Sequence, residues 1–148
     1  MTIVDLATTK GRGYPAGRIT KNLVNGSSPV ALDYCSLGFV ELDPNGGQVP
    51  WHNHVQEEVY IILDGEGQMC IGDECHRITG GQMVHIPSNA YHQLTNTGDV
   101  PMHMVYCYAP AGDVDHWKQE LAGTLPKAGI DVPALPEGAW PQHTDPPA

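Results

Sequence analysis

The sequence predicts an all-β fold in which short strands form a small antiparallel barrel or sandwich. Short runs of β-branched and aliphatic residues recur along the chain, and turn-forming residues separate them. The 17 glycines and 13 prolines, with only 16% charged residues, fit many turns better than long helices. A chain of 148 residues is long enough to enclose one hydrophobic core, so we expect one barrel domain.

The barrel is expected to span residues 19–112, after an N-terminal arm over residues 1–18 that has little hydrophobic pattern. Gly72-Asp73 has the form of a two-residue hairpin loop between two strands. The runs of strand-forming residues predict strands over residues 19–24, 30–42, 59–63, 68–71, 75–78, 82–86 and 102–109.

Residues 113–148 are predicted to form a short helix followed by an extended, proline-rich tail. Asp113 can cap a helix over residues 114–122, and Gly123 can end it. Trp117 and Leu121 would share one face of this helix, which would close one end of the barrel or pack on its flank. Trp140 is costly to leave in water, so we expect part of the tail to lie along its own domain or a neighbouring subunit.

The charge of the chain excludes nucleic acid as a partner. The formal net charge is −10 at pH 7, and no run of Lys or Arg offsets it. The N-terminus has no basic region followed by an apolar run, and no apolar segment is long enough to span a bilayer. We therefore expect a cytoplasmic protein that has no membrane partner and binds a small molecule.

The four cysteines form no CxxC pair, which argues against a structural zinc site. If Gly72-Asp73 is a hairpin loop, Cys70 and Cys75 lie directly opposite each other, and a disulfide is conceivable. Reduced thiols are the favoured expectation for a cytosolic protein.

The segment from Gly46 to Gly65 carries the residues that predict chemistry. His52 and His54 are two residues apart, which on a strand places both imidazoles on one face. Two neutral imidazoles and a carboxylate suit a divalent transition metal. Glu57 and Glu58 both lie near enough to supply the carboxylate, and spacing does not choose between them. A fourth ligand could come from any histidine that the fold brings close.

This segment resembles the first cupin motif, a glycine, five residues, His-x-His, three residues, Glu, six residues and Gly. Gly46, His52, His54, Glu58 and Gly65 match these positions. A second cupin motif is matched by Gly81, Pro87, Asn89, His92 and Asn96, where Asn89 replaces the usual glycine. Asn tolerates the positive φ of such a turn better than most residues.

The resemblance implies a double-stranded β-helix (jelly-roll) barrel that pairs into a homodimer. It also implies that His52, His54, Glu58 and His92 are the metal ligands. One divalent transition metal per chain is expected, and Fe, Mn, Ni, Co and Zn are all compatible with three imidazoles and a carboxylate.

The expected function is that of a metal-dependent enzyme acting on a small oxygenated organic molecule that chelates the metal. A dioxygenase is placed first, because two open coordination positions can hold substrate and oxygen together. A lyase, isomerase or decarboxylase that uses the metal as a Lewis acid is the alternative. A cupin that binds a small metabolite without turnover is the third possibility.

Tyr60 follows Glu58 by two residues and should point into the same interior. It could act as an acid or base or bind a metal-bound ligand, or it could be an aromatic wall residue. The same Glu-x-Tyr spacing occurs in cupin lyases that cleave dimethylsulfoniopropionate, and it is common among cupins.

The substrate pocket is expected to include Met104, Tyr106 and Tyr108, which alternate along one strand. Trp51 could line the entrance or pack outside the barrel. The seven Lys and Arg residues provide no evident basic group for this pocket, which favours a neutral or weakly anionic ligand. His85 is expected not to be a ligand, and the histidines expected at the surface are His76, His116 and His143.

Overall fold

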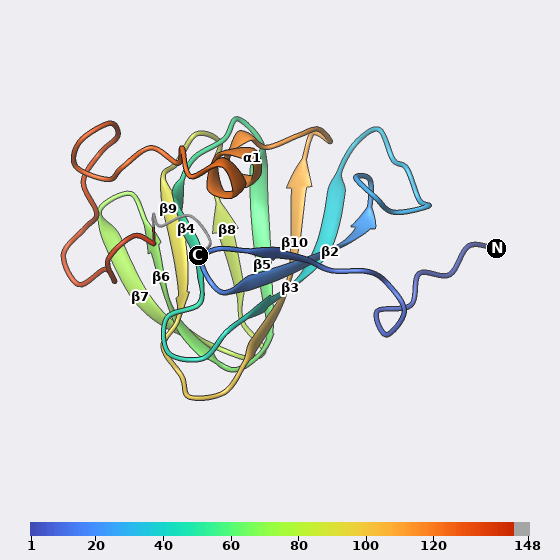
Figure 1. Cartoon of the computed structure of the whole chain (residues 1–148), viewed down its shortest axis with the longest axis horizontal. Coiled ribbons are helices and arrows are strands. Elements are labelled where there is room, and N and C mark those ends of the chain that lie inside the picture. The colour runs from blue at the N-terminus through green and yellow to red at the C-terminus, as the bar shows by residue number, and fades with distance from the viewer. Residues whose placement is uncertain (144–148) are drawn as a thin grey trace.

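The structure is a computed structural model that describes residues 1–143. In this part of the chain, the strands form two antiparallel sheets, with the strand orders β1-β2-β3-β10-β5-β8 and β4-β9-β6-β7 (Figure 1). The elements are β1 (Arg12–Tyr14), β2 (Arg18–Val24), β3 (Ser36–Leu42), β4 (Gln48–His52), β5 (Glu57–Asp64), β6 (Glu66–Ile71), β7 (Glu74–Thr79), β8 (Met83–Ile86), β9 (His92–Asn96), β10 (Met102–Ala109) and α1 (Asp115–Ala122). The predicted all-β jelly roll is confirmed.

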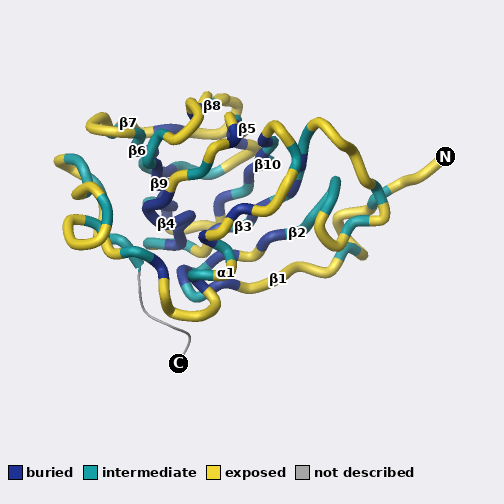
Figure 2. The backbone as a smooth tube through the Cα atoms, turned by 90° about the horizontal axis from the view of Figure 1, so that it is seen from above, coloured by how far each residue is buried: buried dark blue, intermediate teal, exposed yellow. Residues whose placement is uncertain are grey.

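The core lies between the two sheets, where buried residues of facing strands meet (Figure 2). Burial alternates along β10, so that Met102, Met104, Tyr106 and Tyr108 point inward and the residues between them point outward. The same alternation along β3 places Val40 and Leu42 in the core. This pattern explains why the strands could be read from the sequence.

Two predicted segments differ from the structure. The strand expected over residues 30–42 begins only at Ser36, because the Asn25 side chain binds Leu32 and the Cys35 carbonyl and so holds the preceding segment as a loop. The expected N-terminal arm contains β1, which pairs with β2. None of the helices in the described residues is both long and apolar enough to cross a membrane.

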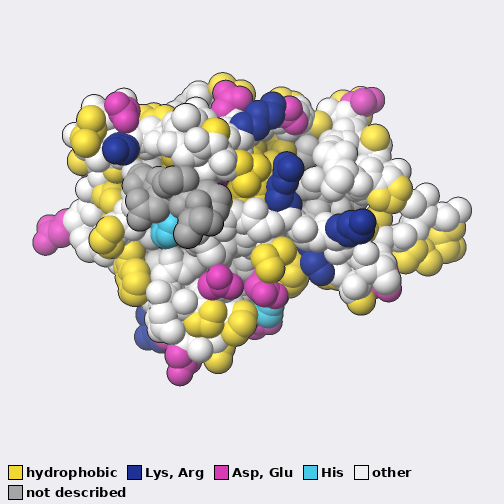
Figure 3. Space-filling view, in the orientation of Figure 1, with side chains coloured by type: hydrophobic (Ala, Val, Ile, Leu, Met, Phe, Trp, Pro, Cys, Tyr) yellow, Lys and Arg dark blue, Asp and Glu magenta, His cyan; other side chains and the backbone are white. Residues whose placement is uncertain are grey.

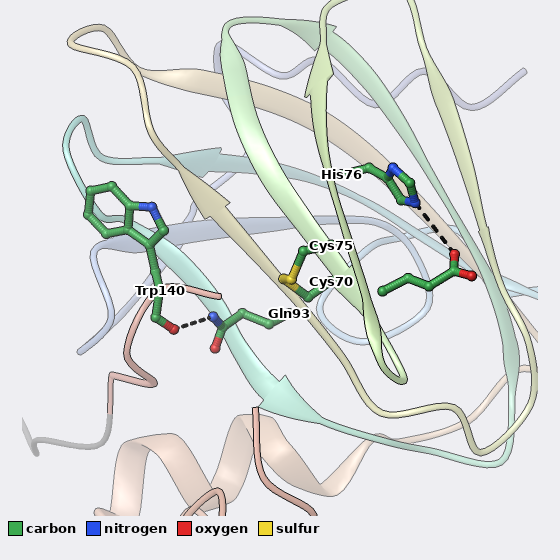
Figure 4. The surroundings of a disulfide bond; sticks show 6 residues. Cys70, Cys75, His76, Gln93 and Trp140 are labelled. Carbon is green, nitrogen blue, oxygen red and sulfur yellow. Dashed lines mark hydrogen bonds and ion pairs between the residues drawn. A yellow bond between two sulfur atoms is a disulfide. The ribbon is translucent and has the colours of Figure 1, made fainter. Parts of the chain in front are cut away.

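The hairpin of β6 and β7 has the predicted two-residue loop, and its register pairs Cys70 with Cys75. These cysteines form a disulfide with a Cα–Cα distance of 4.1 Å (Figure 4). The expectation of reduced thiols is therefore wrong at this pair. Directly opposite positions in an antiparallel pair bring two side chains close enough to bridge.

The disulfide is expected to stabilise the fold modestly, because it closes only a short loop. For a sequence separation of 5, the loop-entropy model gives about 2 kcal/mol. We expect a Cys70→Ser/Cys75→Ser variant to lose about this free energy of unfolding in urea denaturation followed by circular dichroism. Reductant should destabilise the wild type and leave the variant unchanged, and equal sensitivity of both proteins would contradict the prediction.

Helix α1 lies across one end of the barrel, as expected for a closing helix (Figure 1). Gly123 ends it with a φ of 67°, as predicted. Its N-terminus differs, because the N-cap is Val114 and no side chain caps it, while Asp113 instead pairs with Lys118. The expected Trp117/Leu121 face is also only partly right, since the buried residues of α1 are His116 and Glu120.

The tail lies along its own barrel as far as residue 143, and the remainder of the expected tail, residues 144–148, is outside the described residues. Gln93 Nε2 donates to the Trp140 carbonyl at 2.8 Å (Figure 4), and Gln48 Nε2 donates to the Pro141 carbonyl at 2.9 Å. Gln142 Nε2 donates to the Trp51 carbonyl at 3.1 Å. These bonds hold the tail against β4 and β9.

The outer face of the larger sheet carries a histidine whose charge contributes to stability. His103 Nδ1 lies 2.8 Å from Asp64 Oδ1, and its Nε2 lies 3.1 Å from Glu41 Oε2. Partial burial opposes protonation, but the two carboxylates outweigh it and raise the pKa of His103. With a folded pKa above the unfolded value of about 6.5, this stabilisation is complete at lower pH and is lost as pH rises through the folded pKa.

We therefore expect His103→Gln to lower the free energy of unfolding more at about pH 5.5 than at about pH 8.5. Urea denaturation of both proteins at the two pH values measures the difference. The same loss at both values would show that the charge of His103 contributes nothing.

Candidate metal centre

Three imidazoles and one carboxylate converge inside the barrel. The ligand atoms of His52, His54, Glu58 and His92 all lie within 4.8 Å of one another. His52 ends β4 directly opposite His92, which begins β9, and their ring centroids are 4.1 Å apart. Glu58 reaches the same point from β5 in the other sheet, and it is buried. Glu57 is exposed and lies 3.5 Å from His85, so Glu58 is the carboxylate of the cluster.

His54 reaches the cluster from a loop, not from a strand. The expectation that His52 and His54 share a strand face is wrong, because β4 ends at His52. The loop is fixed by the Asn89 N–H, which donates to the His54 carbonyl at 2.8 Å. Asn89 has a φ of 62°, as expected for the residue that replaces the motif glycine. The second motif thus positions a ligand of the first.

The backbone determines which nitrogen of each imidazole faces the cluster. The Nδ1 atoms of His52, His54 and His92 lie 2.7, 3.0 and 2.9 Å from the carbonyl oxygens of Pro50, Gln56 and Ala90. A carbonyl oxygen only accepts hydrogen bonds, so each Nδ1 carries the proton. Each neutral imidazole therefore presents an Nε2 lone pair, as metal-binding histidines do.

Without a cation, these lone pairs have no suitable partner. Glu58 Oε2 lies 3.0 Å from His54 Nε2 and 3.3 Å from His92 Nε2. All three atoms are hydrogen-bond acceptors, so no hydrogen bond forms between them. Among the described residues, the buried Nε2 atoms of His52 and His92 have no hydrogen-bond partner. Burial of unpaired polar atoms is costly, and a divalent cation would satisfy all four groups at once.

The protonation states also suit a metal. Burial, followed by the nearby His116, His92 and His54 imidazoles, lowers the pKa of His52 well below its usual value. At neutral pH, His52 is therefore neutral, which is the form of an imidazole that binds metal.

A family model described as "Cupin domain" matches residues 38–108, which contain both histidine motifs. The chain belongs to the cupin superfamily. The cluster of candidate metal ligands combines residues from both cupin motifs.

Similar proteins include two dimethylsulfoniopropionate lyases of Ruegeria pomeroyi. The lyase DddW is 33% identical over 91 residues, which cover 62% of this cupin and 58% of DddW. The structure of DddQ matches with a TM-score of 0.61 and 28% identity, over 74% of this cupin and 59% of DddQ. An uncharacterized protein of Methanocaldococcus jannaschii is 34% identical over 68 residues, 45% of this cupin and 54% of that protein. The match thus spans only a little over half of these curated relatives.

A small cavity adjoins the cluster at His54 and Glu58. Tyr60, Met104, Tyr106 and Tyr108 line it together with His54 and Glu58, so the Met/Tyr face of β10 does border the cavity. Its volume is about 20 Å³, close to the space that a water-sized group requires. Trp51 does not line this cavity, since it packs beneath the tail and its Nε1 donates to the Pro133 carbonyl at 3.0 Å.

Tyr60 keeps its proton in the cation-free protein. Burial, followed by the negative charge of Glu58, raises the pKa of Tyr60 well above its usual value. The side chain is 2% exposed, and its ring centroid lies 6.1 Å from that of His92. Tyr60 is therefore a neutral phenol beside the candidate metal ligands.

Three charged or titratable groups of this region were missed by the sequence analysis. Arg18 and Glu120 form a buried ion pair, with Arg18 Nη2 2.7 Å from Glu120 Oε1. His116 Nδ1 lies 2.9 Å from the same oxygen, and its ring stacks on that of His52 with centroids 3.6 Å apart. Burial lowers the pKa of His116 to about 4, which keeps it neutral at neutral pH.

The buried group of Arg18, Glu120 and His116 corrects two expectations. Arg18 lines the cavity, so the expectation that the pocket has no basic group is wrong. His116 is buried, although it was expected at the surface; His76 is exposed and His143 is half-buried. The i,i+4 spacing of His116 and Glu120 on the predicted helix was the signal that could have indicated a shared buried face.

The Arg18–Glu120 pair predicts a large stability effect from a single substitution. Arg18→Met leaves Glu120 buried without its counter-charge, and we expect it to lower the free energy of unfolding by about 3–5 kcal/mol. Arg18→Met/Glu120→Leu removes both charges and should lose much less. Urea denaturation of both single variants and the double variant measures the coupling, and additive losses would contradict it.

Proposed function

We propose that this cupin is a metal-dependent lyase that acts on a small organic molecule through proton transfer. The single observation that carries the proposal is the position of Tyr60, a buried phenol lining the same small cavity as the His54 and Glu58 side chains of the cluster. The similarity to DddW and DddQ supports a lyase ahead of the dioxygenase that the sequence analysis placed first.

The residues would divide the work of such a reaction between them. A divalent cation held by His52, His54, Glu58 and His92 would act as a Lewis acid, polarise a substrate oxygen and lower the pKa of nearby hydroxyl groups. Tyr60 lines the cavity and can exchange a proton with a substrate there. Met104, Tyr106 and Tyr108 line the same cavity from β10, the strand paired with β5, and help to exclude water.

The test begins with elemental analysis of protein purified without chelators, followed by reconstitution with Fe²⁺, Mn²⁺, Ni²⁺, Co²⁺ or Zn²⁺. Each form is incubated with dimethylsulfoniopropionate and with small hydroxy and keto acids, and products are followed by mass spectrometry. Turnover of one such compound without oxygen supports the lyase. Failure to bind any of these metals would contradict the proposal.

A dioxygenase is the second candidate, favoured by a four-residue cluster that is mostly buried and borders a small cavity. An oxygen electrode separates the two activities, because a dioxygenase consumes oxygen in step with its substrate. Metal-dependent binding of a compound without any turnover would instead indicate a cupin that binds a small metabolite.

A homodimer is also proposed, with the outer face of the larger sheet as its interface. The registers align Phe39, Val105, Ile61 and Met83 in one outward-facing row across β3, β10, β5 and β8. Ile61 and Met83 are 43% and 61% exposed. An exposed apolar row of this kind is typical of an association surface. Size-exclusion chromatography with light scattering should report a dimer, and Ile61→Lys should shift it to a monomer.

A further inference from the structure

Arg18 carries hydrogen-bond donors that the protein itself does not use. Its side chain is buried, Nη2 binds Glu120, and the guanidinium group lies 4.1 Å above the Tyr14 ring. Within the described residues, the buried Nε and Nη1 atoms have no partner. Thr20 Oγ1 is also buried without a partner, and both side chains line the cavity beside the metal ligands. Two buried side chains without hydrogen-bond partners on one wall indicate that a ligand supplies those partners.

We propose that Arg18 and Thr20 bind a carboxylate group of the substrate, an inference that rests on the proposed function and adds its substrate class. A guanidinium donates strong, charge-assisted hydrogen bonds to a carboxylate, and a hydroxyl can add one more. A carboxylate bound here lies in the same cavity as Tyr60, Glu58 and His54. The reacting part of the molecule then faces the cluster while its acid end is held at Arg18.

The balance of charge in the cavity supports an anion. A divalent cation carries two positive charges and Arg18 one, which together exceed the two negative charges of Glu58 and Glu120 by one. One carboxylate would neutralise the site. Since an uncompensated charge is costly at this depth, the loaded cavity favours a monoanion over a neutral molecule.

The surface leading to this cavity is also basic, although the chain as a whole is acidic. A groove of about 490 Å³ lies outside the cavity and shares Thr20, Val114 and Trp117 with it. Of the seven Lys and Arg residues, Lys10, Arg12 and Lys118 line the groove and Arg18 lines the cavity. Asp113 also borders the groove and pairs with Lys118, whereas Lys10 and Arg12 have no ion pair within residues 1–143.

Several of these basic side chains gather near the centre of one face of the molecule (Figure 3). A cluster of one sign attracts ligands of the other, so the groove would bring anions to the cavity despite the net charge of −10. Val114 and Trp117 of the helix segment border both the groove and the cavity of about 20 Å³, and this cavity must widen to admit a ligand larger than water.

The test measures binding, not turnover, so it does not depend on the lyase being correct. Zn²⁺-loaded protein is titrated calorimetrically with propionate and with its neutral analogue propionamide. We expect propionate to bind about tenfold more tightly than propionamide. Arg18→Met/Glu120→Leu should lose about tenfold in affinity for propionate, while Arg77→Met, which removes an exposed arginine outside the cavity, should leave it unchanged.

A third variant separates ligand binding from a structural role of the ion pair. Glu120→Gln removes a negative charge beside Arg18 and should tighten propionate binding, whereas mere disruption of the site would weaken it. Equal affinity of the wild type for the acid and the amide would overturn the proposal. So would unchanged propionate affinity in Arg18→Met/Glu120→Leu, or binding of inorganic phosphate without binding of propionate.

Discussion

His92→Ala is expected to lower the affinity for a divalent metal by about a hundredfold or more, because it removes one of four converging ligands. His92 is fully buried, and its Nδ1 is already held by the Ala90 carbonyl. Its lone pair is therefore oriented before the metal arrives. Calorimetric titration with Zn²⁺ or Mn²⁺ measures the loss.

The matched control is His85→Ala, which removes an exposed histidine of β8 that is not part of the cluster. It should keep the wild-type affinity. Circular dichroism should show that the His92 variant remains folded, and Gln in place of His92 fills the vacated volume if alanine destabilises the core. Full metal occupancy in both His92 variants would contradict the assignment of this ligand.

Tyr60→Phe is expected to reduce turnover by about 100- to 10,000-fold, the usual contribution of a positioned acid or base. The substitution removes only the hydroxyl, so the ring continues to fill its buried place among the core residues. Metal affinity should stay within a factor of about two, since Tyr60 is not one of the four ligands.

Tyr106→Phe is a suitable comparison, because Tyr106 lines the same cavity but its hydroxyl makes a long 3.4 Å hydrogen bond to Asn22. It should affect turnover much less. If Tyr60→Phe and Tyr106→Phe reduce turnover equally, Tyr60 serves only as part of the wall. Reduced metal binding in Tyr60→Phe would also contradict the proposed role.

The cupin resemblance predicted the four candidate ligands that the structure brings together, whereas spacing alone left Glu57 and Glu58 as alternatives. His52 and His92 meet by strand register, and Glu58 follows from the alternation along β5. The spacing of His52 and His54 wrongly predicted that His54 lies on the strand, because β4 ends at His52. A hydrogen bond from the Asn89 N–H to the His54 carbonyl still fixes the loop that carries His54. Motif positions were therefore more informative than the secondary structure assigned to them.

The Arg18–Glu120–His116 cluster could not be found in the same way. Its ion pair joins residues 102 positions apart, and Arg18 belongs to a segment that looks like a polar arm. A buried arginine has no hydrophobic pattern of its own, so only the packing of α1 over β1 and β2 identifies it. The absence of a basic group in the pocket was inferred from composition, which does not place side chains in space.

The glutamines that fix the tail connect the end of the chain to the metal ligands. β4 is an edge strand, and Gln142 supplies a donor to its Trp51 carbonyl, next to His52. Detaching the tail from β4 would free the strand that carries His52. Because the coupling is reciprocal, a metal bound at the candidate site should make the tail harder to detach. Limited proteolysis of the tail would then report whether the site is occupied.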